Sequence, residues 1–324
     1  MKRILASALC FLAVCSANAQ YKSGQPFGLD MSENEARMYE HVQYLSASSL
    51  DGRAAGSEGE AEAARYMTAQ FRNYGLDVFS GEDGDLFGMK RESGDTLTSR
   101  NVLAFVPGYD KELKDHYIVI SARLDNLGSM VVNLDGQKRE KIFYGANGNA
   151  SGLAILLELA RMLNTNSVLL KRSVILAAFG SSLQGGAGAW YFLNRSFSGV
   201  QSIDAMVNLE MLGTGSNGFY AYTASNADLN MLLTSMQGTL QPVQPQMVAK
   251  EPVNSDHRIF YDKEIPAVMF TTGMYPEYNT EKDTAGILEY SDMERELEYL
   301  YNFCIALANG AKPEFKPTEQ THRR

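Results

Sequence analysis

The chain has 324 residues, a formal net charge of −9 at pH 7 and 45% hydrophobic residues. An acidic chain without basic clusters argues against nucleic acid or an anionic membrane surface as a partner. The length allows one large domain or two smaller ones. No Pro/Ser-rich run, repeat or low-complexity tract divides residues 20–312, so we expect a single domain there.

The N-terminus has the pattern of an export signal. A basic Met-Lys-Arg start precedes an apolar run over residues 4–14 and small residues that end at Ala19. This pattern predicts a signal peptide over residues 1–19, cleaved near Ala19, and a periplasmic or extracellular protein. The apolar run is too short for a mature membrane anchor, so we expect no transmembrane segment. A lipoprotein modified at Cys15 is disfavoured because valine precedes that cysteine.

The cysteine count argues against a disulfide framework. Cleavage of the signal removes Cys10 and Cys15 and leaves Cys304 alone. The apolar helical setting of Cys304 predicts a buried structural thiol. After the domain, residues 313–324 are polar and contain proline, which predicts a flexible polar tail.

Strands and helices alternate along the predicted domain. Short apolar runs rich in β-branched residues predict core strands that are buried on both faces. These strands are expected at residues 101–107, 117–122, 171–179, 205–212 and 265–271. Helices are expected at residues 31–50, 60–74, from Ser151 onward, 186–196, 226–238 and 291–309. The alternation predicts an α/β fold with a mixed, mostly parallel central sheet flanked by helices on both faces.

One loop organises the functional prediction. Residues 144–152 read Tyr-Gly-Ala-Asn-Gly-Asn-Ala-Ser-Gly and lead into apolar residues at helical spacing, with Asn149 or Ser151 placed to cap the helix. The loop closely resembles the metal-site loop of the co-catalytic zinc aminopeptidases, metallopeptidase family 28. In that family the pattern Gly-Ala-Asx-Asp-Asn-Ala-Ser-Gly supplies an aspartate that bridges two zinc ions. Here that position is Gly148.

The resemblance extends over about residues 35–308 and implies a zinc-exopeptidase-like (phosphorylase/hydrolase-like) three-layer sandwich. It also implies five metal-binding positions at strand ends, where functional side chains collect in such sheets. The family's Ala-His-x-Asp corresponds to residues 122–125, so Arg123 replaces a histidine ligand. Arginine has no lone pair to donate and does not lose its proton. Asp125 keeps the aspartate that orients this histidine in the family.

Three further segments complete the comparison. The family's Gly-Glu-Glu corresponds to residues 180–182, so Ser181 stands at the general-base position and Ser182 at a ligand position. Serine neither takes up a proton near neutral pH nor balances a divalent cation. Glu210 replaces an aspartate ligand and could still bind metal. His257 is the one unaltered ligand, and Asn279 stands where the family usually has histidine.

The ligand count implies a degenerate site. Catalytic zinc needs about three protein ligands plus water at each centre. Only His257 is intact and Glu210 chemically able, whereas the ligands are lost at Arg123, Gly148 and Ser182. The sequence therefore predicts a secreted family 28 homologue that has lost both ancestral zinc ions, needs no cofactor and is catalytically inactive, with a binding or scaffolding role in the old cleft.

The carboxylates that remain need a counter-charge, because an unpaired buried carboxylate is costly. We expect Arg123 to fill the empty metal position and to pair with Glu210 or Asp125. A peptide or amine ligand in this cleft is conceivable, and the oligomeric state is left open. The residues expected to line the site are Asp125, Asn147, Asp256, Asn279, Tyr275 and Tyr278.

The sequence leaves two alternative functions open. A weak or atypical zinc-dependent aminopeptidase could use His257 and Glu210 with improvised ligands. A serine-type hydrolase could use Ser181 or Ser182 with His257, because a catalytic triad is defined by geometry and not by chain order. No nucleophile-elbow sequence surrounds these serines, which argues against the second alternative.

Overall fold

A computed structural model describes residues 31–90, 94–134 and 137–316. The predicted signal peptide and residues 317–324 of the predicted tail lie outside the described residues. The described residues from Glu33 onward belong to one compact unit. No helix within the described ranges is long and apolar enough to cross a membrane.

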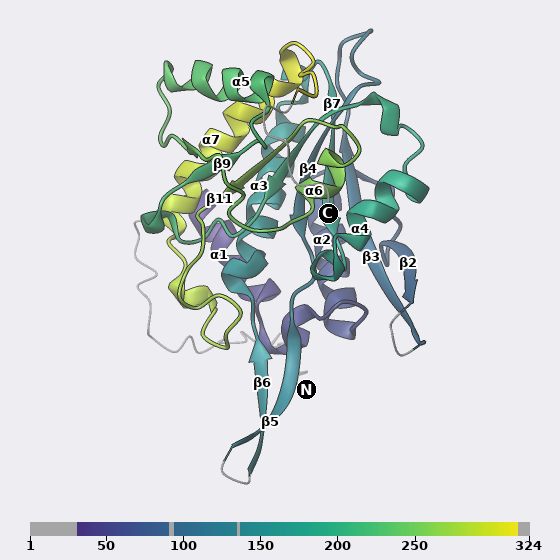
Figure 1. The fold of residues 1–324 in the computed structure, drawn as a ribbon, viewed down its shortest axis with the longest axis vertical. Coiled ribbons are helices and arrows are strands. Elements are labelled where there is room, and N and C mark those ends of the chain that lie inside the picture. The colour runs from purple at the N-terminus through teal and green to yellow at the C-terminus, as the bar shows by residue number, and fades with distance from the viewer. Residues whose placement is uncertain (1–30, 91–93, 135–136, 317–324) are drawn as a thin grey trace, which may run out of the picture. The chain divides into compact units, whose positions relative to one another are not determined.

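A nine-stranded sheet forms the centre of this unit (Figure 1). Its strands are β1 (Asp77–Val78), β2 (Asp85–Lys90), β3 (Thr96–Val106), β4 (Tyr117–Arg123), β7 (Ser173–Phe179), β8 (Ile203–Leu209), β9 (Tyr220–Tyr222), β10 (Gln246–Met247) and β11 (Ala267–Thr271). Their order is β1-β3-β7-β4-β8-β11-β9-β10, and β2 also pairs with β3. The central strands β7, β4, β8 and β11 are parallel, whereas β3 and β9 run antiparallel to their neighbours β7 and β11. The predicted mixed, mostly parallel sheet is confirmed.

Helices cover both faces of the sheet. They are α1 (Glu33–Leu45), α2 (Glu58–Asn73), α3 (Ser151–Thr165), α4 (Ala187–Tyr191), α5 (Ala227–Gln237), α6 (His257–Tyr261) and α7 (Tyr290–Asn309). Alternate residues of one strand point to opposite faces, so Ile118 and Ile120 join the core beneath α1, α2, α3, α5 and α7. Val119 joins the second core, beneath α4 and α6. This alternation explains why the central strands carry apolar residues on both faces.

Several predicted boundaries differ from the structure. The first helix ends at Leu45, and residues Ser48–Arg53 form a separate short helical turn. The helix predicted at 186–196 comprises α4 and a following π-helical turn over Phe192–Ser196. Cys304 on α7 is buried, as predicted.

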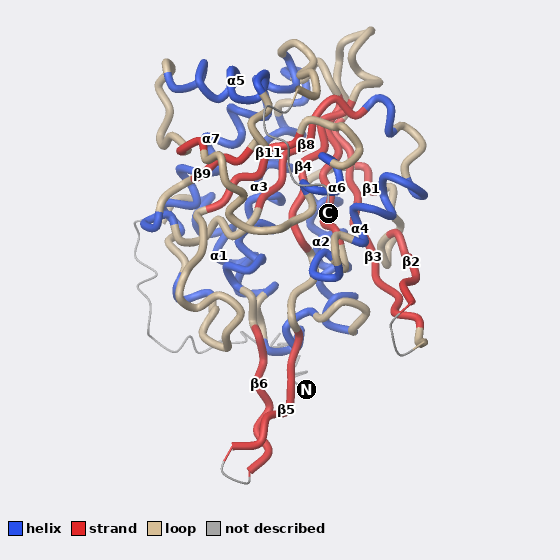
Figure 2. Tube along the Cα trace, in the orientation of Figure 1, coloured by secondary structure: helices blue, strands red, loops and turns tan. Residues whose placement is uncertain are grey.

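A β-hairpin was missed by the sequence analysis. Strands β5 (Gly128–Leu134) and β6 (Gln137–Phe143) pair only with each other, and they extend away from the nine-stranded sheet (Figure 2). Most of their described side chains are exposed, and β6 begins with the charged run Lys138 to Lys141. Because neither face is buried in a core, the strands carry no apolar alternation that would have revealed them.

The topology brings three chain segments to one edge of the sheet. In the parallel register, Arg123 at the end of β4 lies opposite Phe179 at the end of β7, and Ala122 lies opposite Leu209 at the end of β8. The segments that follow these three strands therefore meet. This is the edge at which open α/β sheets bind their ligands.

Candidate functional site

Arg123 lies at the centre of this edge and is only 4% exposed. Its Nη2 donates to Oε1 of Glu210 over 2.9 Å, and its Nη1 donates to the backbone oxygen of Asp125 over 3.0 Å. Burial alone would lower the pKa of Arg123, but the carboxylates of Glu210 and Asp125 outweigh it and raise the pKa further above its ordinary value. The guanidinium is therefore a permanent cation inside the site.

The second oxygen of Glu210 is also engaged. Ser255 Oγ donates to Glu210 Oε2 over 2.8 Å, and Asn208 Nδ2 donates to Ser255 Oγ over 2.9 Å. Ser121 Oγ in turn donates to Asn208 Oδ1 over 3.1 Å. We call these side chains, together with Arg123, the Arg123 network. Each oxygen of Glu210 thus accepts one hydrogen bond within this network.

Asp125 holds the loop that follows β7. Its two carboxylate oxygens accept the backbone N–H groups of Ser182, over 2.8 Å, and of Leu183, over 3.2 Å. Burial raises the pKa of Asp125 above its ordinary value, although Arg123 and these two donors act in the opposite direction. The side chain thus fixes the segment in which the family carries its general base.

Gly148 faces Arg123 across the site. The Asp283 carboxylate accepts the backbone N–H groups of Asn147 (2.8 Å) and Gly148 (3.1 Å) and the hydroxyl of Tyr275 (2.7 Å). A Cβ on Gly148 would lie 3.1 Å from Tyr275 Oη, 3.4 Å from Asp283 Oδ2 and 3.6 Å from Arg123 Nη2. A carboxylate at position 148 would therefore meet the Arg123 guanidinium.

The predicted helix cap at this loop is wrong. Ala150 is the N-cap of α3, and no side chain caps the helix. Ser151 Oγ donates to the backbone oxygen of Asn147 over 2.9 Å. Asn149 bonds the backbone oxygen of Leu209 and the backbone N–H of Met211, each over 2.9 Å. These polar side chains thus tie the loop to the end of β8, a tertiary role that a local capping pattern does not reveal.

Arg53 stabilises the loop that begins at Tyr144, and no motif in the sequence marks it as a site residue. It is fully buried and donates to the backbone oxygens of four residues, which are Leu45, Leu124, Tyr144 and Gly145. Burial, reinforced by the charge of Arg123, lowers its pKa to about 10. Because these carbonyls flank β4, β5 and β6, one side chain fixes the root of the hairpin to the site.

The two serines after β7 differ sharply. Ser181 has a left-handed backbone (φ 51°), and its buried Oγ has no hydrogen-bond partner. Ser182 Oγ donates to Asp256 Oδ2 over 2.6 Å. Asp256 is fully buried, and its pKa rises to about 7 because of burial and the nearby charges of Asp125 and Glu210, against the bond from Ser182. Neither serine makes a hydrogen bond with His257, whose ring nitrogens have none.

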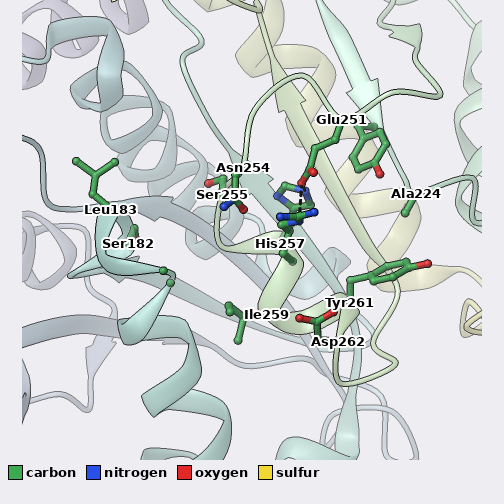
Figure 3. A pocket seen from close by; sticks show the side chains of 14 residues that line it. Ser182, Leu183, Ala224, Glu251, Asn254, Ser255, His257, Ile259, Tyr261 and Asp262 are labelled. Carbon is green, nitrogen blue, oxygen red and sulfur yellow. Dashed lines mark ion pairs between the residues drawn. The ribbon is translucent and has the colours of Figure 1, made fainter. Parts of the chain in front are cut away.

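His257 contacts a residue that the sequence analysis missed. Its Nε2 lies 2.7 Å from Glu251 Oε1, although the contact lacks the alignment of a hydrogen bond (Figure 3). Glu251 Oε1 also lies 3.2 Å from Arg258 Nε. The Tyr222 ring packs edge-to-face on His257, with centroids 5.8 Å apart. Glu251 belongs to an irregular loop between β10 and α6, and no motif in that loop marks it.

A cavity of about 600 Å³ opens beside the Arg123 network. Its walls come from the loop after β7, from β9, from the loop that carries Glu251 and from α6 (Figure 3). Ser182 and Ser255 belong to both the cavity wall and the site. Tyr275 and Tyr278, whose rings meet edge-to-face at 5.8 Å, and Asn279 do not line this cavity; Tyr275 lies on the Gly148 side of the site.

The donor set of this site does not fit two zinc ions. Among residues 31–90, 94–134 and 137–316, no group of three or more His, Cys, Asp or Glu side chains is arranged to hold a metal ion. Of the ligand positions that the resemblance implies, one holds the guanidinium of Arg123 and one is Gly148, which has no side chain. A third holds Ser182, whose hydroxyl donates to the Asp256 carboxylate.

Known proteins share this fold. The sequence model for Peptidase family M28 matches residues 101–303. An aminopeptidase from Aneurinibacillus sp. strain AM-1 is 18% identical with a TM-score of 0.66, covering 90% of this chain and 98% of that chain. A zinc aminopeptidase from Bacillus subtilis is 14% identical with a TM-score of 0.65, covering 88% of this chain and 98% of that chain. The glutaminyl cyclase of Porphyromonas gingivalis is 19% identical with a TM-score of 0.63, covering 83% of this chain and 97% of that chain.

No match to the chain was found among the curated proteins. At these identities the structural neighbours show the α/β fold alone, whereas the sequence model covers more than half of the chain. The resemblance to the zinc aminopeptidases found in the sequence is thereby confirmed at the level of the family. This chain belongs to peptidase family M28.

Proposed function

We propose that this family M28 member does not hydrolyse peptides, and that it is exported and acts by binding or scaffolding through the old cleft. One observation carries the proposal. The Arg123 guanidinium lies 2.9 Å from Glu210, at the position where the family has a zinc-bound histidine. A cation that is part of the chain takes the place of the metal.

Electrostatics supports this proposal. A zinc ion about 4 Å from the Arg123 guanidinium would be repelled by on the order of 8 kcal/mol at an effective dielectric constant of about 20. If zinc instead captured Glu210, the buried arginine would lose its partner, and breaking a buried ion pair costs about 3–5 kcal/mol. Zinc binding therefore works against both members of the pair.

The missing general base supports it independently. Loss of a general base costs about 10²–10⁴ in rate. Ser181 occupies that position, and its Oγ is buried without any partner that could accept its proton. Ser182 donates to Asp256 and has no contact with His257 that would form a triad.

The test compares the natural protein with a reconstructed site. Both proteins are purified without chelators, their zinc content is measured by mass spectrometry, and release of p-nitroaniline from leucine p-nitroanilide is followed. The reconstructed variant carries Arg123→His, Gly148→Asp, Ser181→Glu, Ser182→Glu and Glu210→Asp. We expect the natural protein to hold far less than one zinc ion per chain and to release no product, whereas the variant takes up zinc.

Two results would overturn the proposal. Stoichiometric zinc together with p-nitroaniline release by the natural protein would establish the weak zinc aminopeptidase. Labelling by a fluorophosphonate probe that Ser182→Ala abolishes would establish the serine-type hydrolase instead. Cell fractionation tests export, which would be refuted if the full-length chain stays in the cytoplasm with residues 1–19 attached.

A further inference from the structure

The cavity beside the Arg123 network presents acidic groups at its wall. Glu251 and Asp262 both line it. The positively charged side chain that faces Glu251 from the wall is Arg258, which is 53% exposed. Glu251 is only 19% exposed and keeps its contact with His257 Nε2, whereas the exposed Arg258 guanidinium can move into water when a ligand takes its place.

Buried polar atoms around the same cavity lack partners. His257, which is 3% exposed, has no hydrogen bond at either ring nitrogen. Oδ1 of the fully buried Asp256 also has none, and it lies 3.5 Å from where a Cβ of Gly186 would stand. His257 and Gly186 line the cavity, and Asp256 lies behind Gly186. An unsatisfied buried polar group costs about 1–3 kcal/mol, so a ligand that offers hydrogen-bond donors would relieve that cost.

Aromatic rings complete the wall. Tyr222 and Tyr261 both line the cavity, and Tyr222 packs against His257. A ring face attracts a cation by about 0.5–2 kcal/mol, the larger value applying away from water. Carboxylates, unpaired acceptors and aromatic rings together suit a flat or compact organic cation better than a neutral or acidic group. The volume of about 600 Å³ admits a ligand the size of an amino acid or dipeptide.

We propose that this cavity binds the guanidinium group of a ligand, which replaces Arg258 at Oε1 of Glu251. The proposal rests on the proposed function in one respect, since the ligand is expected to leave the site unhydrolysed. The net charge of −9 favours the approach of such a cation from a distance.

The experiment uses two probes of nearly identical shape. Binding of L-argininamide and of L-citrullinamide to the natural protein is measured by titration calorimetry. Citrulline replaces the charged guanidinium by a neutral ureido group, so we expect its amide to bind at least tenfold more weakly. Equal binding of both probes, or binding of neither, would overturn the proposal.

Two variants test the replacement of Arg258. Glu251→Gln should weaken the binding of L-argininamide at least tenfold, whereas Arg258→Ala should strengthen it because the internal competitor is gone. Glu281→Gln is the matched control, since Glu281 pairs with Arg139 on the hairpin and does not line the cavity. If Arg258→Ala weakens binding, Arg258 is a ligand-binding residue and the proposal is wrong.

The same titration separates this proposal from the proposed function. If free arginine appears during the titration, the protein is an aminopeptidase and the proposed function fails, while a charge-selective cavity would still stand. If no arginine appears and the two probes bind equally, the cavity proposal fails and the inactive site is untouched.

Discussion

Arg123 keeps a buried cluster of carboxylates together. Without it, Glu210 would lose its ion-pair partner, and the fully buried Asp125 would lose the nearby charge that lowers its pKa. We therefore expect Arg123→Met to lower the free energy of unfolding by about 3–5 kcal/mol, as for other broken buried pairs. Urea denaturation followed by circular dichroism measures the change.

Arg139 supplies the control for this prediction. It also pairs with a glutamate, Glu281, over 3.1 Å, but its side chain is 60% exposed. Arg139→Met should change the free energy of unfolding by no more than about 1 kcal/mol. The double variant Arg123→Met with Glu210→Gln should recover part of the loss, because it removes the stranded charge. Equal effects of the two single variants would show that burial of the pair is unimportant.

Substitution by glycine should change the free energy of unfolding in opposite directions at Ser181 and Ser182. Ser181→Gly relieves a left-handed backbone, which costs other residues about 1–2 kcal/mol, and removes an unpartnered buried hydroxyl. We expect it to stabilise the protein by about 1 kcal/mol after the entropic cost of glycine. Ser182→Gly should destabilise by about 1–3 kcal/mol, because Asp256 then loses its donor. Thermal unfolding of both variants decides the matter; a loss of stability in both would refute the strain argument.

At the scale of elements, the start of α2 carries a pH-dependent contribution to stability. Burial raises the pKa of Glu60 to about 7, despite hydrogen bonds from Ser99 Oγ and the Gly56 N–H. The unfolded chain releases this proton near pH 4.5, whereas the folded chain keeps it until about pH 7. Stability from this group is therefore complete below pH 4.5 and falls as the pH rises to 7, by up to about 1.4 kcal/mol per unit.

Removal of the carboxyl should abolish this slope. We expect the wild-type protein to lose stability relative to Glu60→Gln between pH 4.5 and 7, measured by urea denaturation at several pH values. Glu62 lies on the same helix, and a bond from Tyr44 together with Arg65 lowers its pKa. Relative to Glu62→Gln, the wild type should instead lose stability only below about pH 4.5. A parallel response of the two variants would contradict the assignment.

The elements that could be predicted are those with a buried periodic pattern. Strands β4 and β7 and helix α3 were located because their apolar residues face cores on fixed spacings. The β5–β6 hairpin faces no core, so its residues carry no such period. The α3 cap was mistaken because Asn149 and Ser151 bond residues distant in sequence, which are Leu209 at the end of β8 and Leu212 after it. Local pattern indicates local structure only.

Within the site, too, only some of the residues could be predicted from the sequence. The segments around Arg123, Gly148 and Ser182 were found because the family motif fixes their spacing to strands. Glu251 and Arg53 were missed, since each acts through a loop or turn whose path depends on the whole fold. Neither residue type nor spacing distinguishes them in the sequence from the charged residues at the surface.

At the scale of the whole molecule, an internal cation should make stability independent of metal. Since Arg123 is covalently part of the chain, we expect EDTA at millimolar concentration to leave the melting temperature unchanged. The reconstructed five-residue variant is the control, because a protein that binds zinc only when folded loses that stabilisation on chelation. A fall in the melting temperature of the natural protein with EDTA, reversed by added zinc, would contradict the internal replacement.

The β5–β6 hairpin is connected directly to two segments of the site. Gly128 follows Asp125 by three residues, and Phe143 precedes Gly148 by five, so both strands of the hairpin are continuous with segments that carry site residues. Arg53 clamps the backbone on both sides of this root. A fluorophore on the exposed Val131 would thus report, from outside, a displacement that begins between Asp125 and Gly148.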